Sequence, residues 1–264
     1  MHELGRSVRF SVNPFLEKGG CGYNSYASNP AGQGLALFFE LWVELRGVAE
    51  QDTGFVVNVT QIDAEVRRSV VPLFEQKIRE AFGAGGHVGF AGLVELLRSS
   101  WGALAGRFGA AQINRLTLKL NPYRELEIKS VDSNKALFSE RFEFAATHKL
   151  WNDRFSEQKN FEVFGKCANP AGHGHNYVLE VSIEIETGVE IDIVGFEKIV
   201  NDAFIEGVDH RNLNTEVPDF GRLIPTVENI AAVAWNRLAG RFEVGSLEKV
   251  TVWETDKTYC SYYG

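Results

Sequence analysis

The sequence predicts an α+β protein of two tandem ββααββ units, in which helices cover one face of each antiparallel sheet. The first observation is an internal repeat, because LAGRF occurs at 104–108 and again at 238–242, an offset of 134 residues. The second is the period-two alternation of apolar side chains at both ends of each copy. The third is a pair of stretches with helical apolar spacing between them. We therefore expect a first domain at 1–130 and a second at 137–264.

The elements are clearest in the second copy. RFEFAATHKL, at 141–150, alternates so that Phe144, Ala146 and His148 share one face of a strand, and the next strand, from 173 to 185, continues that face. Two helices follow, with apolar stripes over 196–204 and 227–238; Thr226 is the expected N-cap of the second. KVTVWET and TYCSYYG, from 249 to the end, are expected to form the closing strand pair.

Composition argues against several classes of function. The formal net charge is −8, so a general surface for nucleic acid or anionic membrane is not expected. Neither a membrane-spanning apolar run nor a signal peptide is recognisable, so a cytoplasmic location is expected. Cys21, Cys167 and Cys260 are few and far apart, which favours reduced thiols over a disulfide framework.

Three histidines form the candidate metal site. His173 and His175 are two residues apart on one strand and point to the same side, and His148 lies on the matching face of another strand. Three neutral nitrogen ligands with an open fourth position are typical of catalytic zinc, although three imidazoles also suit other divalent ions. Any one of these histidines taken singly is better explained as a hydrogen-bonded strand residue than as a metal ligand.

The first copy serves as an internal comparison for this site. NPAG occurs at 29–32 and again at 169–172, an offset of 140. The offset of 134 places Pro14 opposite His148, and the offset of 140 places Gln33 and Leu35 opposite the other two histidines and Ala27 opposite Cys167. The polar set is lost together while the apolar faces remain. This pattern predicts a site in the second copy and a scaffold role for the first.

The same comparison adds further candidates. Asp209 and His210 follow the first helix of the second copy, and Glu254 ends the buried face of a closing strand, where the first copy has a leucine. Thr226 and Glu228 at the start of the second helix are also absent from the first copy. Singly, each could be a turn, a cap or a salt-bridge partner; their joint loss favours a site.

Cys167 has two interpretations. A lone cysteine is commonly a small buried hydrophobe. Beside a bound metal and an Asp-His pair, its thiol could instead ionise and act as a base.

Five motifs now support a family resemblance. FAATHKL, FGKCANPAGHGHNY, DHRNLN, PTVENIA and VTVWET, in this order, resemble the 6-pyruvoyltetrahydropterin synthase and 6-carboxytetrahydropterin synthase family over 140–264. The first copy resembles a degenerate version of the same tunnelling fold (T-fold).

The resemblance implies a zinc-dependent carbon-oxygen lyase acting on phosphates in tetrahydrobiopterin biosynthesis. It implies that His148, His173 and His175 hold Zn²⁺ and that Cys167 is the base. Asp209 and His210 would assist the base, while Glu254, aided by Thr226 and Glu228, would bind the pterin. The implied substrate is 7,8-dihydroneopterin triphosphate, from which triphosphate is eliminated to give 6-pyruvoyltetrahydropterin.

Two alternatives stay open at this point. The carboxy-forming branch uses the same substrate for deazapurine (queuosine) synthesis, but usually has a shorter gap than the five residues between Cys167 and His173. A pterin- or metal-binding protein without turnover would need the same pocket. Because antiparallel sheets of this family join across subunits, a homo-oligomer is also expected.

Overall fold

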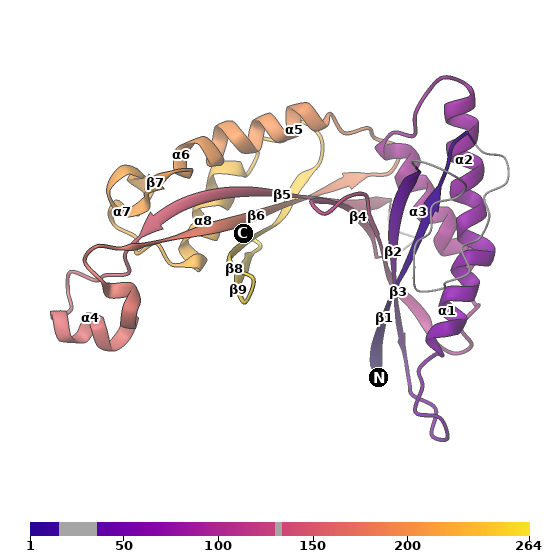
Figure 1. The fold of residues 1–264 in the computed structure, drawn as a ribbon, viewed down its shortest axis with the longest axis horizontal. Coiled ribbons are helices and arrows are strands. Elements are labelled where there is room, and N and C mark those ends of the chain that lie inside the picture. Colours follow the sequence, from indigo (N-terminus) through magenta and orange to yellow (C-terminus); the bar gives the residue numbers. More distant parts are fainter. Residues whose placement is uncertain (16–35, 130–133) are drawn as a thin grey trace. The chain divides into compact units, whose positions relative to one another are not determined.

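The computed structural model describes residues 1–15, 36–129 and 134–264, which pack as two compact units. The first holds residues 1–138 and 185–191, and the second holds residues 139–184 and 192–264. Both are α+β, with antiparallel sheets and helices, as expected (Figure 1).

The first unit contains the sheet order β1-β2-β3-β4. Its strands are β1 His2–Val12, β2 Leu37–Gly47, β3 Gln112–Lys119 and β4 Arg124–Ile128. Between β2 and β3 run α1 Val59–Glu65, the π-helical turn η1 Val66–Val70, α2 Val71–Gly83 and α3 Phe90–Leu104. The buried side chains of these strands and helices, among them Leu41, Val43, Phe74 and Leu97, form its core.

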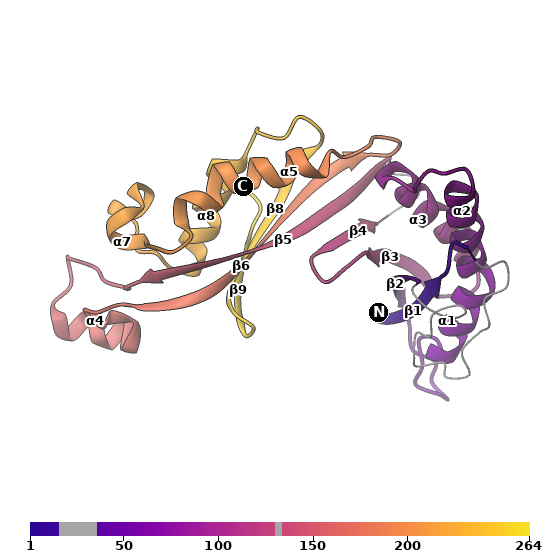
Figure 2. The same cartoon turned by 45° about the horizontal axis from the view of Figure 1, so that its top comes forward.

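The second unit contains the strand order β5-β6-β8-β9, and β7 (Arg211–Asn212) pairs with β5. Its strands are β5 Lys135–His148, β6 His173–Glu186, β8 Ser246–Thr255 and β9 Thr258–Tyr262; the first four residues of β5 and the last two of β6 belong to the first unit. Helices α5 Ile193–Val200, η3 Asn201–Ile205 (a π-helical turn), α6 Glu206–Val208 and α8 Val227–Leu238 follow β6, and α5 and α8 lie on the same side of the sheet (Figure 2).

Short elements that periodicity did not predict complete the second unit. They are α4 Glu157–Phe164 and the 3-10 turn η2 Gly165–Ala168, between β5 and β6, and β7 Arg211–Asn212, α7 Leu213–Glu216 and η4 Pro218–Gly221. α4 begins at Ser156, whose side chain accepts the Lys159 N–H. It lies beyond the ends of β5 and β6 (Figure 1). η2 brings Cys167 back to β5, because the Cys167 carbonyl accepts the Leu150 N–H at 2.9 Å.

Several local expectations are confirmed. Phe144, Ala146 and His148 are buried on alternate positions of β5, and Thr226 caps α8 by accepting the Asn229 N–H at 3.4 Å. Cys167 and Cys260 are free thiols. Cys21, Ala27, Gln33 and Leu35, together with 130–133 of the expected boundary, lie outside the described residues.

Candidate metal centre

The three predicted histidines converge in the second unit. His148 ends β5, and His173 and His175 begin β6; one ring nitrogen from each lies within 4.8 Å of the others. The Nε2 atoms of His148 and His173 are 3.1 Å apart. Two ligands on a tetrahedral Zn²⁺, with Zn–N of about 2.0–2.1 Å, lie about 3.3 Å apart.

The fold presents His148 to the cluster in one tautomer. Its Nδ1–H donates to the Pro225 carbonyl at 2.7 Å, because a carbonyl can only accept, and this leaves the Nε2 lone pair toward the other histidines. Burial is the main reason that the pKa of His148 falls to about 4, so the ring is neutral near pH 7. Burial likewise lowers the pKa of His175, although Glu254 opposes this.

One buried ring nitrogen tests whether the site suits a cation. His175 Nε2 has no hydrogen-bond partner among the described residues. An orphaned buried polar atom is costly, so it calls for an occupant. Neutral imidazoles with open lone pairs are ligands that divalent transition metals prefer, and the donor set therefore fits a metal.

Glu254 lies at the edge of this cluster, as the alternation in β8 predicted. Its Oε1 is 3.5 Å from His148 Nε2 and 3.6 Å from His175 Nε2. Burial, and then the Glu254 charge, raise the pKa of the Cys167 thiol. Cys167 therefore stays protonated in the metal-free chain, and its ionisation needs a positive charge nearby.

Asp209 and His210 form a prearranged pair at the end of β5. Asp209 Oδ1 accepts the Ala145 N–H at 2.8 Å, which is the main cause of its lowered pKa, and Asp209 Oδ2 lies 2.8 Å from His210 Nδ1. His210 adopts φ 56°, a left-handed conformation that a residue without functional or structural constraint rarely holds. A pocket of about 480 Å³ is lined by both His210 and His175.

The predicted site residues do not all contact one another in the structure. Within the described chain no hydrogen bond links Cys167 to Asp209 or His210, and the His210 side chain is 81% exposed. Thr226 serves as a helix cap, and Glu228 is exposed on the first turn of α8, where its charge acts on Cys260.

Two contacts of His148 were not predicted from the sequence. Tyr177 shares the histidine face of β6, and its hydroxyl lies 3.5 Å from each ring nitrogen of His148; the period-two pattern marked the position but not the contact. Pro225 acts through its main-chain carbonyl, for which the sequence carries no signal.

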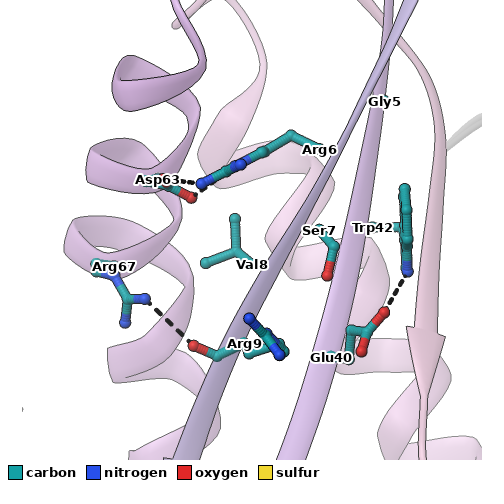
Figure 3. A pocket seen from close by; sticks show the side chains of 9 residues that line it. All are labelled: Gly5, Arg6, Ser7, Val8, Arg9, Glu40, Trp42, Asp63 and Arg67. Carbon is teal, nitrogen blue, oxygen red and sulfur yellow. Dashed lines mark hydrogen bonds and ion pairs between the residues drawn. The ribbon is translucent and has the colours of Figure 1, made fainter. Parts of the chain in front are cut away.

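The first unit has a pocket of a different chemistry (Figure 3). It has a volume of about 390 Å³ along β1 and is crossed by the Arg6–Asp63 ion pair, with Nη2–Oδ2 at 2.6 Å. Arg67 donates to the Arg9 carbonyl, and Trp42 donates to Glu40. Its lining residues include neither histidine nor cysteine, so it lacks the ligands found in the second unit.

These features define an α+β protein with a candidate three-histidine metal centre in its second unit. The family model for 6-pyruvoyl tetrahydropterin synthase matches residues 138–264. The human 6-pyruvoyl tetrahydrobiopterin synthase is 38% identical over 134 residues, which span 49% of this chain and 92% of that protein. The chain therefore belongs to the 6-pyruvoyl tetrahydropterin synthase family and is a pterin synthase-like lyase.

Two further matches each cover about half of this chain. The 6-carboxy-5,6,7,8-tetrahydropterin synthase of Aquifex aeolicus is 28% identical over 156 residues, covering 47% of this chain and 95% of that protein. The solved 6-pyruvoyl tetrahydropterin synthase of Caenorhabditis elegans is 34% identical and covers 49% of this chain and 96% of that one, with a TM-score of 0.47. In the described residues, we find no helix with the length and apolar character needed to cross a membrane.

Proposed function

We propose that the chain converts 7,8-dihydroneopterin triphosphate to 6-pyruvoyltetrahydropterin with loss of triphosphate. The convergence of His148, His173 and His175 beside Cys167 and Glu254 carries the proposal. A Zn²⁺ ion held by the three histidines would supply a Lewis acid for the substrate's side-chain oxygens.

The chain's own residues would divide the remaining work. Cys167 Sγ would take the carbon-bound proton, and the electron pair of that bond would stay in the substrate, where the hydroxyls become ketones as triphosphate departs. Glu254 would accept hydrogen bonds from the amide and amino groups of the pterin, a paired arrangement that selects this heterocycle. No external oxidant is required.

Asp209 and His210 would assist proton transfer at this site. The exposed His210 ring also supports our proposal of a homo-oligomer, because it is open to a neighbouring copy. A solution mass equal to one chain would contradict the oligomer.

We further propose that residues 1–130 are a non-catalytic copy of the catalytic domain at 137–264. The strand order in each unit follows the sequence, apart from β7, which pairs with β5. Each unit also has one bulge in its central strand pair, between Glu44 and Leu45 in the first unit and between Ser182 and Ile183 in the second. Bulges are specific features of a fold. One π-helical turn also occurs in the first helical segment of each unit, which is rare enough to support common architecture.

The deciding assay incubates zinc-loaded protein with 7,8-dihydroneopterin triphosphate, identifies the pterin by mass and follows triphosphate release. A pyruvoyl product supports the proposal, and a carboxy product assigns the chain to the other branch. The five-residue spacing between Cys167 and His173 favours the pyruvoyl product.

Cys167→Ala separates an enzyme from a binding protein. We expect turnover to fall at least about 100-fold, since a positioned base contributes about 10²–10⁴ in rate, while zinc and pterin binding persist. Unaltered turnover would remove Cys167 from the mechanism. Absence of triphosphate release by the unmutated protein would leave a pterin- or metal-binding role.

A further inference from the structure

The hydroxyl of Tyr177 sits in an aromatic cluster whose packing does not require it. In the second unit, the rings of Phe144 and Tyr177 stack with centroids 4.9 Å apart, and Phe204 meets Phe144 edge-on at 5.6 Å. Tyr177 is fully buried. Its ring thus belongs to the hydrophobic core and meets the His175 ring with centroids 5.5 Å apart, while its hydroxyl reaches the ring nitrogens of His148.

The first unit builds a matching cluster without a hydroxyl. Phe10 stacks on Phe39 at 5.5 Å, and Phe74 meets Phe10 edge-on at 5.2 Å. The same chain therefore packs this arrangement with phenylalanine in the place of tyrosine.

Strand register supports the equivalence of Phe39 and Tyr177. Leu41 pairs with Leu118 in the first unit, and Leu179 pairs with Val252 in the second. Phe39 and Tyr177 each precede these residues by two positions. The register gives an offset of 138 on β2 and β6, which places Leu37 opposite His175 and corrects the sequence alignment that placed Leu35 there.

A buried hydroxyl is costly unless it interacts with a polar group. The Tyr177 oxygen is equidistant, at 3.5 Å, from Nδ1 and Nε2 of His148, and the two rings are nearly perpendicular at 86°. That distance is at the upper limit for a hydrogen bond, so the hydroxyl contacts the ring without completing a strong bond to either nitrogen. Since Pro225 holds Nδ1, the ring is constrained at two points.

We propose that Tyr177 is a positioning residue, whose hydroxyl holds the His148 ring so that Nε2 faces the metal. The inference rests on the metal site of the proposed function. In this proposal the aromatic ring of Tyr177 packs in the core, as the ring of Phe39 does in the first unit, and the hydroxyl serves the metal site. Partners of metal-bound histidines that lie outside the coordination shell typically change metal affinity by about 10- to 100-fold.

The test is Tyr177→Phe, a substitution that the chain itself carries at the equivalent position. Zn²⁺ affinity is measured by competition with a chelator, the absorption spectrum of the Co²⁺-loaded protein reports ligand geometry, and urea unfolding of the metal-free protein reports folding. We expect at least about tenfold weaker Zn²⁺ binding and a changed Co²⁺ spectrum, with the unfolding midpoint unchanged.

Phe144→Leu is the matched control, because it disturbs the same stack and retains the hydroxyl. Equal loss of Zn²⁺ affinity in both variants would assign the effect to packing and overturn the proposal, as would wild-type affinity and spectrum in Tyr177→Phe. If the unmutated chain binds no Zn²⁺, the metal site and this role both fail. If it binds Zn²⁺ and only the Tyr177→Phe result is negative, the metal site stands.

Discussion

Acidification should lower the free energy of unfolding of the metal-free protein, because His148 is buried and neutral in the folded chain. Its pKa is about 4 in the folded chain and 6.5 in the unfolded chain, mainly because burial disfavours the charged ring. As pH falls below 6.5 the unfolded chain gains a proton that the folded chain does not, so the stability present above pH 6.5 is lost progressively down to pH 4. A pKa difference of about 2.5 units at about 1.4 kcal/mol each amounts to about 3.5 kcal/mol.

The assay is urea unfolding of chelator-treated protein at a series of pH values, followed by tryptophan fluorescence. His148→Asn provides the comparison, because its amide can still donate toward Pro225 but does not titrate. Other groups titrate in both proteins, so the prediction concerns the difference between the two curves. Parallel curves between pH 6.5 and 4 would refute the burial argument.

Two further predictions concern side chains that hold main-chain groups. Glu190 accepts the Phe90 and Ala91 N–H groups at 2.8 and 3.3 Å at the start of α3. Glu190→Gln should therefore lower the stability of α3 against local unfolding by about 1 kcal/mol, measured as faster amide exchange in α3; unchanged exchange would contradict this capping role. Asn229 Nδ2 donates to the Ile224 carbonyl at 2.8 Å beside Pro225, so Asn229→Leu should weaken Zn²⁺ binding about tenfold by chelator competition. Wild-type affinity would show that this loop is held by other contacts.

Local pattern predicted the elements that carry most of the site. Alternation placed His148, His173 and His175 on one face, and the Thr226 cap predicted where α8 begins. α4 was not predicted, because its eight residues carry only a short and weakly apolar pattern. Periodicity reports a face reliably only when several turns or alternations repeat it.

The chemistry of the site was readable from residue types and spacing, because side-chain direction along a strand is a local property. Spacing could not show that Pro225 contacts His148, 77 residues away, or that Tyr177 reaches the same ring. Nor could it show that, among the described residues, Asp209 and His210 hydrogen-bond no cysteine. Those facts depend on how distant strands, loops and helices pack, and local sequence carries little record of such contacts. The sequence thus determined that the three histidines share one face of two strands, while tertiary packing decided how each is held.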